Sequence, residues 1–146
     1  GRKLAREKVP GAAMKALLAE MSADAETIAG NAQLGNIAVN LKNGINSLST
    51  AADWVIANYE SDPAAVHAGS VPFLKLTGIV VGGWLMAKSA AIAAKRLDEG
   101  SGDTFYNAKL ATARYFATHQ LPFAAAYAAE VTGGAQSTLG LAEELF

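Results

Sequence analysis

The amino-acid sequence predicts an all-α protein: an up-and-down four-helix bundle with a short C-terminal helical turn. Four long segments carry apolar residues at helical spacing, strong helix-breaking signals separate them, and no run shows the alternation of a half-buried strand. The connections are short, so consecutive helices should lie antiparallel. At 146 residues the chain is long enough for one core, and we expect a single helical domain over residues 1–146.

The first two predicted helices are Ala12–Ala29 and Leu34–Tyr59. Pro10-Gly11 opens the first, and Gly30 can cap its C-terminal end. The second carries apolar and small residues at alternating steps of three and four, the pattern of a bundle seam. These inward positions are Leu34, Ile37, Leu41, Gly44, Leu48, Ala51 and Val55.

The third segment has two possible starts. Asp62-Pro63 is a strong helix start, because the carboxylate can accept first-turn N–H groups and proline loses no bond there. Ser70, with Pro72 in its first turn, is a second start. We therefore expect either one bent helix or a short helix followed by a long one, reaching Leu97.

The fourth predicted helix follows the break at Gly100-Ser101-Gly102 and is capped by Asp103. It ends at Gly133-Gly134, and Pro122 should kink it by removing one backbone hydrogen bond. Only a short helical turn fits in the remaining tail.

Composition and charge narrow the functional classes. Hydrophobic residues make up 51% of the chain and charged residues 17%, which is too apolar for disorder. A net charge of −1 gives no electrostatic reason to expect nucleic acid. The first twenty residues have a basic excess, interpreted as a solvated face with a docking patch as the alternative; its members are Arg2, Lys3, Arg6, Lys8 and Lys15.

The most apolar run, Leu76–Ala87, is closed by Lys75 and Lys88. It falls well short of the roughly 20 residues needed to cross a bilayer, so we expect no membrane span. The sequence has no cysteine and no secretory signal, which favours a cytoplasmic protein. Because the chain starts at Gly1 rather than methionine, we expect it to be a fragment of a longer protein.

The search for catalytic chemistry predicts no catalytic, cofactor-binding or metal-ligating residue. The two histidines, His67 and His119, have neither metal-site spacing nor a Glu-x-x-His partner. No serine sits in a nucleophile elbow, and no glycine-rich phosphate loop follows a strand.

One polar cluster is a candidate interface. Arg114, Tyr115, His119 and Gln120 share roughly one side of the last helix. Such a group could contact another subunit or bind an anion, or it could be a buried hydrogen-bonded group or a solvated face.

Gly78, Gly82 and Gly83 form a strip of small residues beside Trp84. We expect the strip to let a neighbouring helix approach closely. Trp84 is then a core anchor, with ligand stacking as the alternative.

Several segments resemble the C-terminal helical domain of acyl-CoA dehydrogenase-like flavoenzymes of the 3-methylmercaptopropionyl-CoA dehydrogenase type. The resemblance is carried by GDTFYNAKLATARYFATHQLPFAAAYAAEVTGG and PFLKLTGIVVGGWLMAKSAA, and more weakly by GAAMKALLAE and LAEELF. It covers about half of the chain closely, and its motifs are not catalytic signatures.

The resemblance implies a parent enzyme that uses FAD and a catalytic glutamate to oxidise the Cα–Cβ bond of an acyl-CoA. In that family these parts lie in earlier domains, so this chain would be non-catalytic alone and serve packing or subunit contact. Its partners would be the preceding flavin-binding domains and a second subunit. Two other functions stay open: an independent adaptor or docking bundle that uses the basic N-terminal face, and a small ligand-binding bundle around Trp84.

Overall fold

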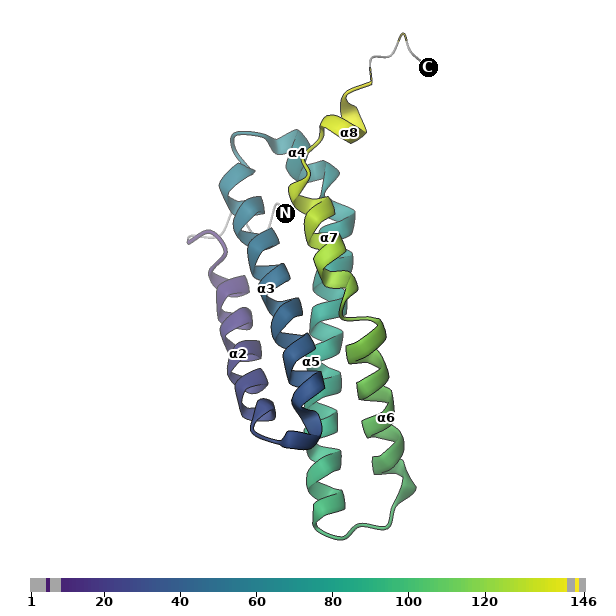
Figure 1. The fold of residues 1–146 in the computed structure, drawn as a ribbon. Coiled ribbons are helices and arrows are strands. Elements are labelled where there is room, and N and C mark those ends of the chain that lie inside the picture. The colour runs from purple at the N-terminus through teal and green to yellow at the C-terminus, as the bar shows by residue number, and fades with distance from the viewer. Residues whose placement is uncertain (1–4, 6–8, 142–143, 145–146) are drawn as a thin grey trace.

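The computed structural model describes residue 5, residues 9–141 and residue 144, and within them the predicted up-and-down four-helix bundle is confirmed (Figure 1). The four legs of the bundle are α2 (Ala12–Ala29), α3 (Gly35–Asn58), α5 (Ser70–Asp98) and the pair α6 (Thr104–His119) and α7 (Phe123–Thr132). A 3₁₀ turn, Ala32–Leu34, and two short helices, α4 (Pro63–Ala68) and α8 (Gln136–Leu139), complete the order. Four of the basic N-terminal residues fall outside the described part of the chain: Arg2, Lys3, Arg6 and Lys8.

Helices α3 and α5 form the centre of the bundle. Helix α2 packs against both of them, and α6 and α7 pack against both from the other side. Figure 1 shows that the hairpin between α5 and α6 extends beyond the turn between α2 and α3. The C-terminal end of α5 therefore has fewer helices around it than its middle does.

The two predicted aspartate caps are confirmed. Asp62 accepts a hydrogen bond from the Ala65 N–H at 3.0 Å, at the start of α4. Asp103 accepts from the Phe105 N–H at 2.9 Å, at the start of α6. Both side chains satisfy first-turn donors that the helix itself leaves unpaired.

The third segment is a short helix followed by a long one, which decides between the two predicted alternatives. The break falls at Gly69, which is buried where α4 meets α7. A Cβ atom there would lie 3.1 Å from the carbonyl oxygen of Val131. A side chain at this position would therefore require the two backbones to move slightly apart.

The fourth segment is interrupted rather than kinked, so the prediction of one bent helix is corrected. Helix α6 ends at His119, α7 begins at Phe123, and Pro122 lies between them. The N–H of Leu121 reaches back five residues to the carbonyl of Phe116 at 3.0 Å, which widens the last turn of α6. Proline has no N–H with which to continue the ladder, so the helix restarts after it.

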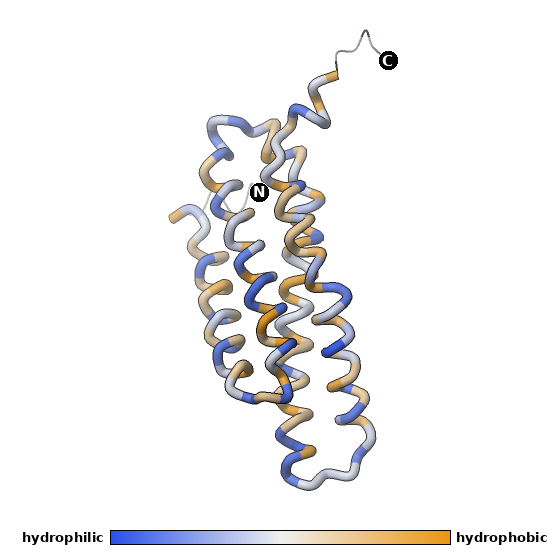
Figure 2. Tube along the Cα trace, viewed as in Figure 1, coloured by the Kyte–Doolittle hydropathy of each residue, from blue (hydrophilic) through white to orange (hydrophobic). Residues whose placement is uncertain are grey.

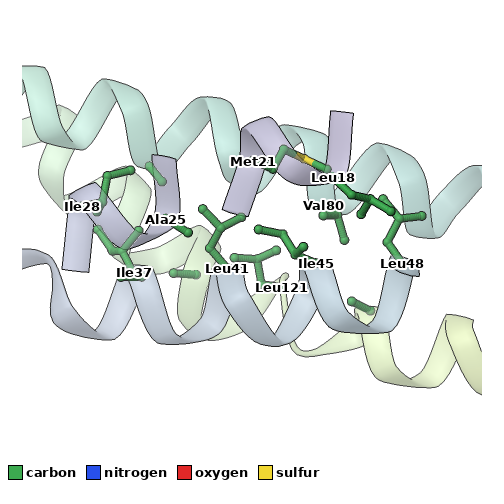
Figure 3. Packing of buried hydrophobic residues seen from close by; sticks show 14 of the residues in the cluster. Leu18, Met21, Ala25, Ile28, Ile37, Leu41, Ile45, Leu48, Val80 and Leu121 are labelled. Atoms are coloured by element: carbon green, nitrogen blue, oxygen red, sulfur yellow. The ribbon is translucent and has the colours of Figure 1, made fainter. Parts of the chain in front are cut away.

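The core lies between the four legs and confirms the predicted seam of α3. All seven seam positions are buried, Leu34 in the 3₁₀ turn and the other six in α3. Figure 3 shows Ile37 and Leu41 near Ala25 and Ile28 of α2, whereas Gly44 faces Leu121 and Val80. Figure 2 shows hydrophobic positions along the middle of the long helices and hydrophilic ones near the C-terminal end of α5. Burial of these apolar side chains stabilises the fold.

Leu121, which follows α6, is held between two glycines on the central helices. A Cβ on Gly44 of α3 would lie 3.3 Å from its Cδ2 atom, and a Cβ on Gly83 of α5 would lie 2.6 Å from the same atom. Leu121 is only 2% exposed. The close approach predicted for the glycine strip is therefore confirmed at Gly83, while Gly78 has no atom within 4 Å of its would-be Cβ.

Candidate functional site

The predicted interface cluster lies at the C-terminal end of α6 and is mainly exposed. Arg114, Tyr115 and His119 are all exposed, with Tyr115 at 60%, whereas Gln120 is half-buried at the end of the helix. The rings of Tyr115 and His119 stack with centroids 4.7 Å apart and planes tilted by 34°. The two side chains therefore form one aromatic surface that faces away from the core.

Arg114 points to the opposite edge of the same helix, toward the turn before α3. Its Nη2 atom donates to the backbone carbonyl of Gln33 at a long 3.4 Å. One turn later, Thr118 accepts a hydrogen bond from the Asn36 amide at 3.2 Å. The structure thus brings Tyr115 and His119 together and directs Arg114 elsewhere, and the alternative of a buried hydrogen-bonded group does not describe this cluster.

A polar contact that the sequence did not predict joins α2 to α5. The indole Nε1 of Trp84 donates to Oδ2 of Asp24 at 2.8 Å, and Nζ of Lys88 lies 3.3 Å from the same oxygen. Lys88 also lies 4.6 Å from the centroid of the Trp84 ring. The Trp84 hydrogen bond, aided by Lys88, holds the pKa of Asp24 below its ordinary value against the opposing effect of burial.

Trp84 is half-buried against the core, so the core-anchor interpretation describes its body but not its polar edge. Its N–H is taken by Asp24, and Lys88 lies against its ring. These intramolecular contacts engage the indole N–H and one face of the ring.

Sequence reasoning missed an uncovered apolar surface on α5. This outer stripe consists of Val71, Leu74, Gly78, Leu85 and Ile92 together with Val81, which is half-buried and packs partly against the core. Four of its residues are large and widely exposed: Val71 at 59%, Leu74 at 73%, Leu85 at 53% and Ile92 at 62%. The signal was present in the sequence as a second set of steps of three and four, displaced by two residues from the buried set.

The apolar character of α5 extends beyond the run between Lys75 and Lys88, which bears on the expectation of no membrane span. Within the described residues, α5 is the one helix long and apolar enough to cross a bilayer, judged by length and composition alone. The run between Lys75 and Lys88 is only part of this 29-residue helix. A core helix passes the same test, and α5 packs against α2, α3, α6 and α7.

Cavities in the described part of the chain lie in shallow grooves between helices. One of about 660 Å³ is lined by Ala68, Pro72, Ala126, Ala129, Glu130, Gly133, Gly134, Ser137 and Thr138. Its walls carry a single carboxylate, Glu130, and two hydroxyl groups. In the residues that the structure describes, no three His, Cys, Asp or Glu side chains gather as a metal site would require.

Comparison with known proteins identifies the family. The chain is 35% identical over 141 residues to 3-methylmercaptopropionyl-CoA dehydrogenase of Ruegeria pomeroyi, a match that covers 95% of this chain and 24% of that protein. It is 29% identical over 130 residues to the broad-specificity linear acyl-CoA dehydrogenase FadE5 of Mycobacterium tuberculosis, covering 83% of this chain and 21% of that protein. The chain therefore spans less than a quarter of the length of either relative.

The family model described as acetyl-CoA dehydrogenase C-terminal like matches residues 17–142, from the middle of α2 to beyond α8. The matched region contains both central helices and the whole of the broken fourth leg. The resemblance seen in the sequence is confirmed, and the chain belongs to the acetyl-CoA dehydrogenase C-terminal-like family.

Proposed function

We propose that this chain is the accessory C-terminal helical domain of an acyl-CoA dehydrogenase-like flavoenzyme. The observation that carries the proposal is the family match over most of the bundle. The parent enzyme would use FAD to oxidise the Cα–Cβ bond of an acyl-CoA, and we expect it to work in the cytoplasm. The two relatives are both acyl-CoA dehydrogenases by name, which supports this class of reaction.

Within such an enzyme, this domain would contribute packing and subunit contacts and would be non-catalytic alone. Its partners would be the preceding flavin-binding domains and a second subunit. Two surfaces support a contact role: the outer stripe of α5 and the stacked Tyr115–His119 pair on α6. Apolar and aromatic groups of this kind are concentrated in the cores of protein interfaces.

Purifying the isolated chain tests whether flavin binding and catalysis belong to other parts of the full-length protein. We expect it to be colourless and to reduce no electron acceptor when acyl-CoA substrates are added, whereas the full-length protein should carry bound flavin absorbance. Flavin that stays with the isolated chain through gel filtration would contradict the proposal. So would a full-length polypeptide with no flavin-binding part.

An independent docking bundle is the second candidate, and the outer stripe is the observation that favours it. A free adaptor also needs an exposed apolar surface for its partner. The two functions differ in what the same polypeptide contains beyond this bundle. A chain that works in cells without any covalently linked flavin-binding part would favour the adaptor.

A further inference from the structure

Helix α5 has two apolar faces, and only one of them meets the rest of the bundle. The core face consists of Leu76, Val80, Gly83, Ala87, Ala90 and Ala94, all buried. Leu74, Gly78 and Leu85 of the outer stripe each lie two residues from one of these positions, which places them on the opposite side of the helix. Only a third of the most apolar 18-residue window of α5 is buried.

The geometry of the outer stripe is that of a seam for another helix. From Val71 to Leu85 its members follow steps of three and four, and Ile92 extends the same spacing by one heptad. Gly78 lies in the middle, with no atom within 4 Å of where its Cβ would be. A second helix can therefore approach the α5 backbone closely at that point. From Val71 to Ile92 the stripe is about 30 Å long, the length of a helix of roughly 20 residues.

Two shallow grooves flank Ile92 at the far end of the outer stripe. One, of about 230 Å³, lies between α2 and α5 and is lined by Asp24, Thr27, Ile28, Lys88, Ala91 and Ile92. The other, of about 200 Å³, lies between α5 and α6 and is lined by Ser89, Ile92, Ala93, Phe105, Tyr106 and Lys109. Apolar side chains of a facing helix could fit into such grooves on either side of Ile92.

The charge beside the outer stripe specifies the chemistry of the occupant. Helix α5 carries four exposed cations, Lys75, Lys88, Lys95 and Arg96, and a single carboxylate, Asp98, at its last residue. Asp24 pairs with Lys88, Glu99 lies near Lys95 and Arg96, and Lys75 lies over the ring of Tyr127. The four cations outnumber the three carboxylates Asp24, Asp98 and Glu99, which leaves a small excess of positive charge. A second copy of α5 would bring the same cations in either direction, so like charges disfavour self-pairing. The narrow seam also differs from the broad apolar face of a helix that lies in a membrane surface.

We propose that the outer stripe of α5 is the docking site for one amphipathic helix of about 20 residues, with an apolar seam flanked by aspartate and glutamate side chains. This inference rests on the proposed function, because the remainder of the flavoenzyme supplies that helix. Apolar contacts along the seam give the complex its stability, and the carboxylates opposite the lysines set its direction.

Thiol labelling tests the docking directly, since the chain has no cysteine of its own. Leu85→Cys and Ile92→Cys are introduced singly into the full-length protein, with Val39→Cys as the matched control on α3. Val39 is 57% exposed, close to the 53% of Leu85. In the native protein we expect labelling at positions 85 and 92 to be at least about tenfold slower than at 39, measured by mass spectrometry of each peptide. Equal rates would overturn the proposal.

A charge-reversal pair tests the nature of the occupant. Lys75→Glu with Lys95→Glu, placed in the Leu85→Cys protein, should raise labelling at 85 severalfold, because carboxylates of the partner are then repelled. Lys15→Glu, an exposed site on α2, is the control and should leave the rate unchanged. Three outcomes would each overturn an acidic helix as the occupant. The first is protection of position 85 that is unchanged by the two charge reversals. The others are a disulfide-linked dimer through position 85 on oxidation, and protection that requires anionic vesicles.

The flavin measurement separates this inference from the proposed function. A yellow, active dehydrogenase with an unprotected position 85 would overturn the docking site and leave the function standing. A protein without flavin whose position 85 is protected in a charge-dependent way would overturn the flavoenzyme function and leave the docking of an acidic helix standing.

Discussion

Single side chains join helices that are far apart in the sequence. Trp84 on α5 donates to Asp24 on α2, and Leu121 reaches between glycines of α3 and α5. These contacts involve few atoms, so exchanging one residue changes a defined distance or a defined charge.

Gly78 and Gly83 offer a matched comparison on one helix. Alanine at 83 would place its Cβ 2.6 Å from Cδ2, 2.9 Å from Cγ and 3.0 Å from Cδ1 of Leu121, so the whole leucine side chain would have to move. We expect Gly83→Ala to destabilise the chain by about 1–3 kcal/mol. Gly78→Ala meets open space and should stabilise it by about 0.5–1 kcal/mol through helix propensity. Urea unfolding of both variants checks this, and equal effects would show that Leu121 does not fill the space beside Gly83.

The Asp24 carboxylate should make stability depend on acid. Its folded-state pKa is lowered, chiefly by the Trp84 hydrogen bond, so its stabilising effect is present above its ordinary pKa of about 4 and is lost as pH falls through the lowered value. We expect Asp24→Asn to remove this part of the acid dependence, measured as melting temperature against pH. Asp53→Asn, an exposed site on α3, is the control. A profile at Asp24→Asn identical to that of the unmodified chain would contradict the assignment.

At the level of elements, α5 combines a buried face and an uncovered face in one helix. It spans the bundle, packs against α2, α3, α6 and α7 and still exposes the outer stripe. The loss of stability caused by a substitution in α5 therefore depends on the face of the helix on which the residue lies. It depends little on the position of the residue along the sequence.

Leu74 and Leu76 test that statement with the same residue type. Leu76 is fully buried and Leu74 is 73% exposed. We expect Leu76→Ala to cost about 2–5 kcal/mol because it opens a cavity, and Leu74→Ala to change the stability of the isolated chain by less than about 0.5 kcal/mol. Thermal melts followed by circular dichroism measure both. A large loss at Leu74 would mean that the outer stripe is buried in the isolated chain.

Elements with local signals were predictable from sequence. The bounds of α2, the caps at Asp62 and Asp103 and the seam of α3 depend on neighbouring residues, and the structure confirms them. The outcome at Gly69 and Pro122 depends on what the backbone meets in three dimensions. Gly69 passes the carbonyl of Val131, and Leu121 enters a space supplied by two other helices.

The candidate site was less predictable for a related reason. The composition of Arg114–Gln120 singled out this cluster, but only the placement of the turn before α3 separates Arg114 from the Tyr115–His119 pair. The outer stripe was not predicted because α5 is apolar on two faces, each with residues at steps of three and four. Periodicity alone does not indicate which of the two faces packs against the bundle.

For the whole molecule, substitutions in the cluster on α6 should affect assembly of the enzyme but not folding of this chain. Arg114 and His119 are exposed, and the Arg114 contact to Gln33 is long. We expect Arg114→Ala with His119→Ala to leave the stability of the isolated chain within about 0.5 kcal/mol. The same change in the full-length enzyme should weaken subunit assembly or activity, measured by sedimentation and turnover. Marked destabilisation of the isolated chain would show instead that the cluster is structural.

The glycine-lined space around Leu121 also fixes how far the fourth leg can slide along the other three. The buried side of α6 and α7 is otherwise nearly uniform through its middle, since Ala113, Ala117, Ala124 and Ala128 are its other members there. A shift by one helical turn would exchange alanine for alanine at small cost. Leu121, however, would then leave the space beside Gly44 and Gly83, where the central helices carry no side chain. One leucine opposite two glycines thus gives an alanine-rich bundle a unique register.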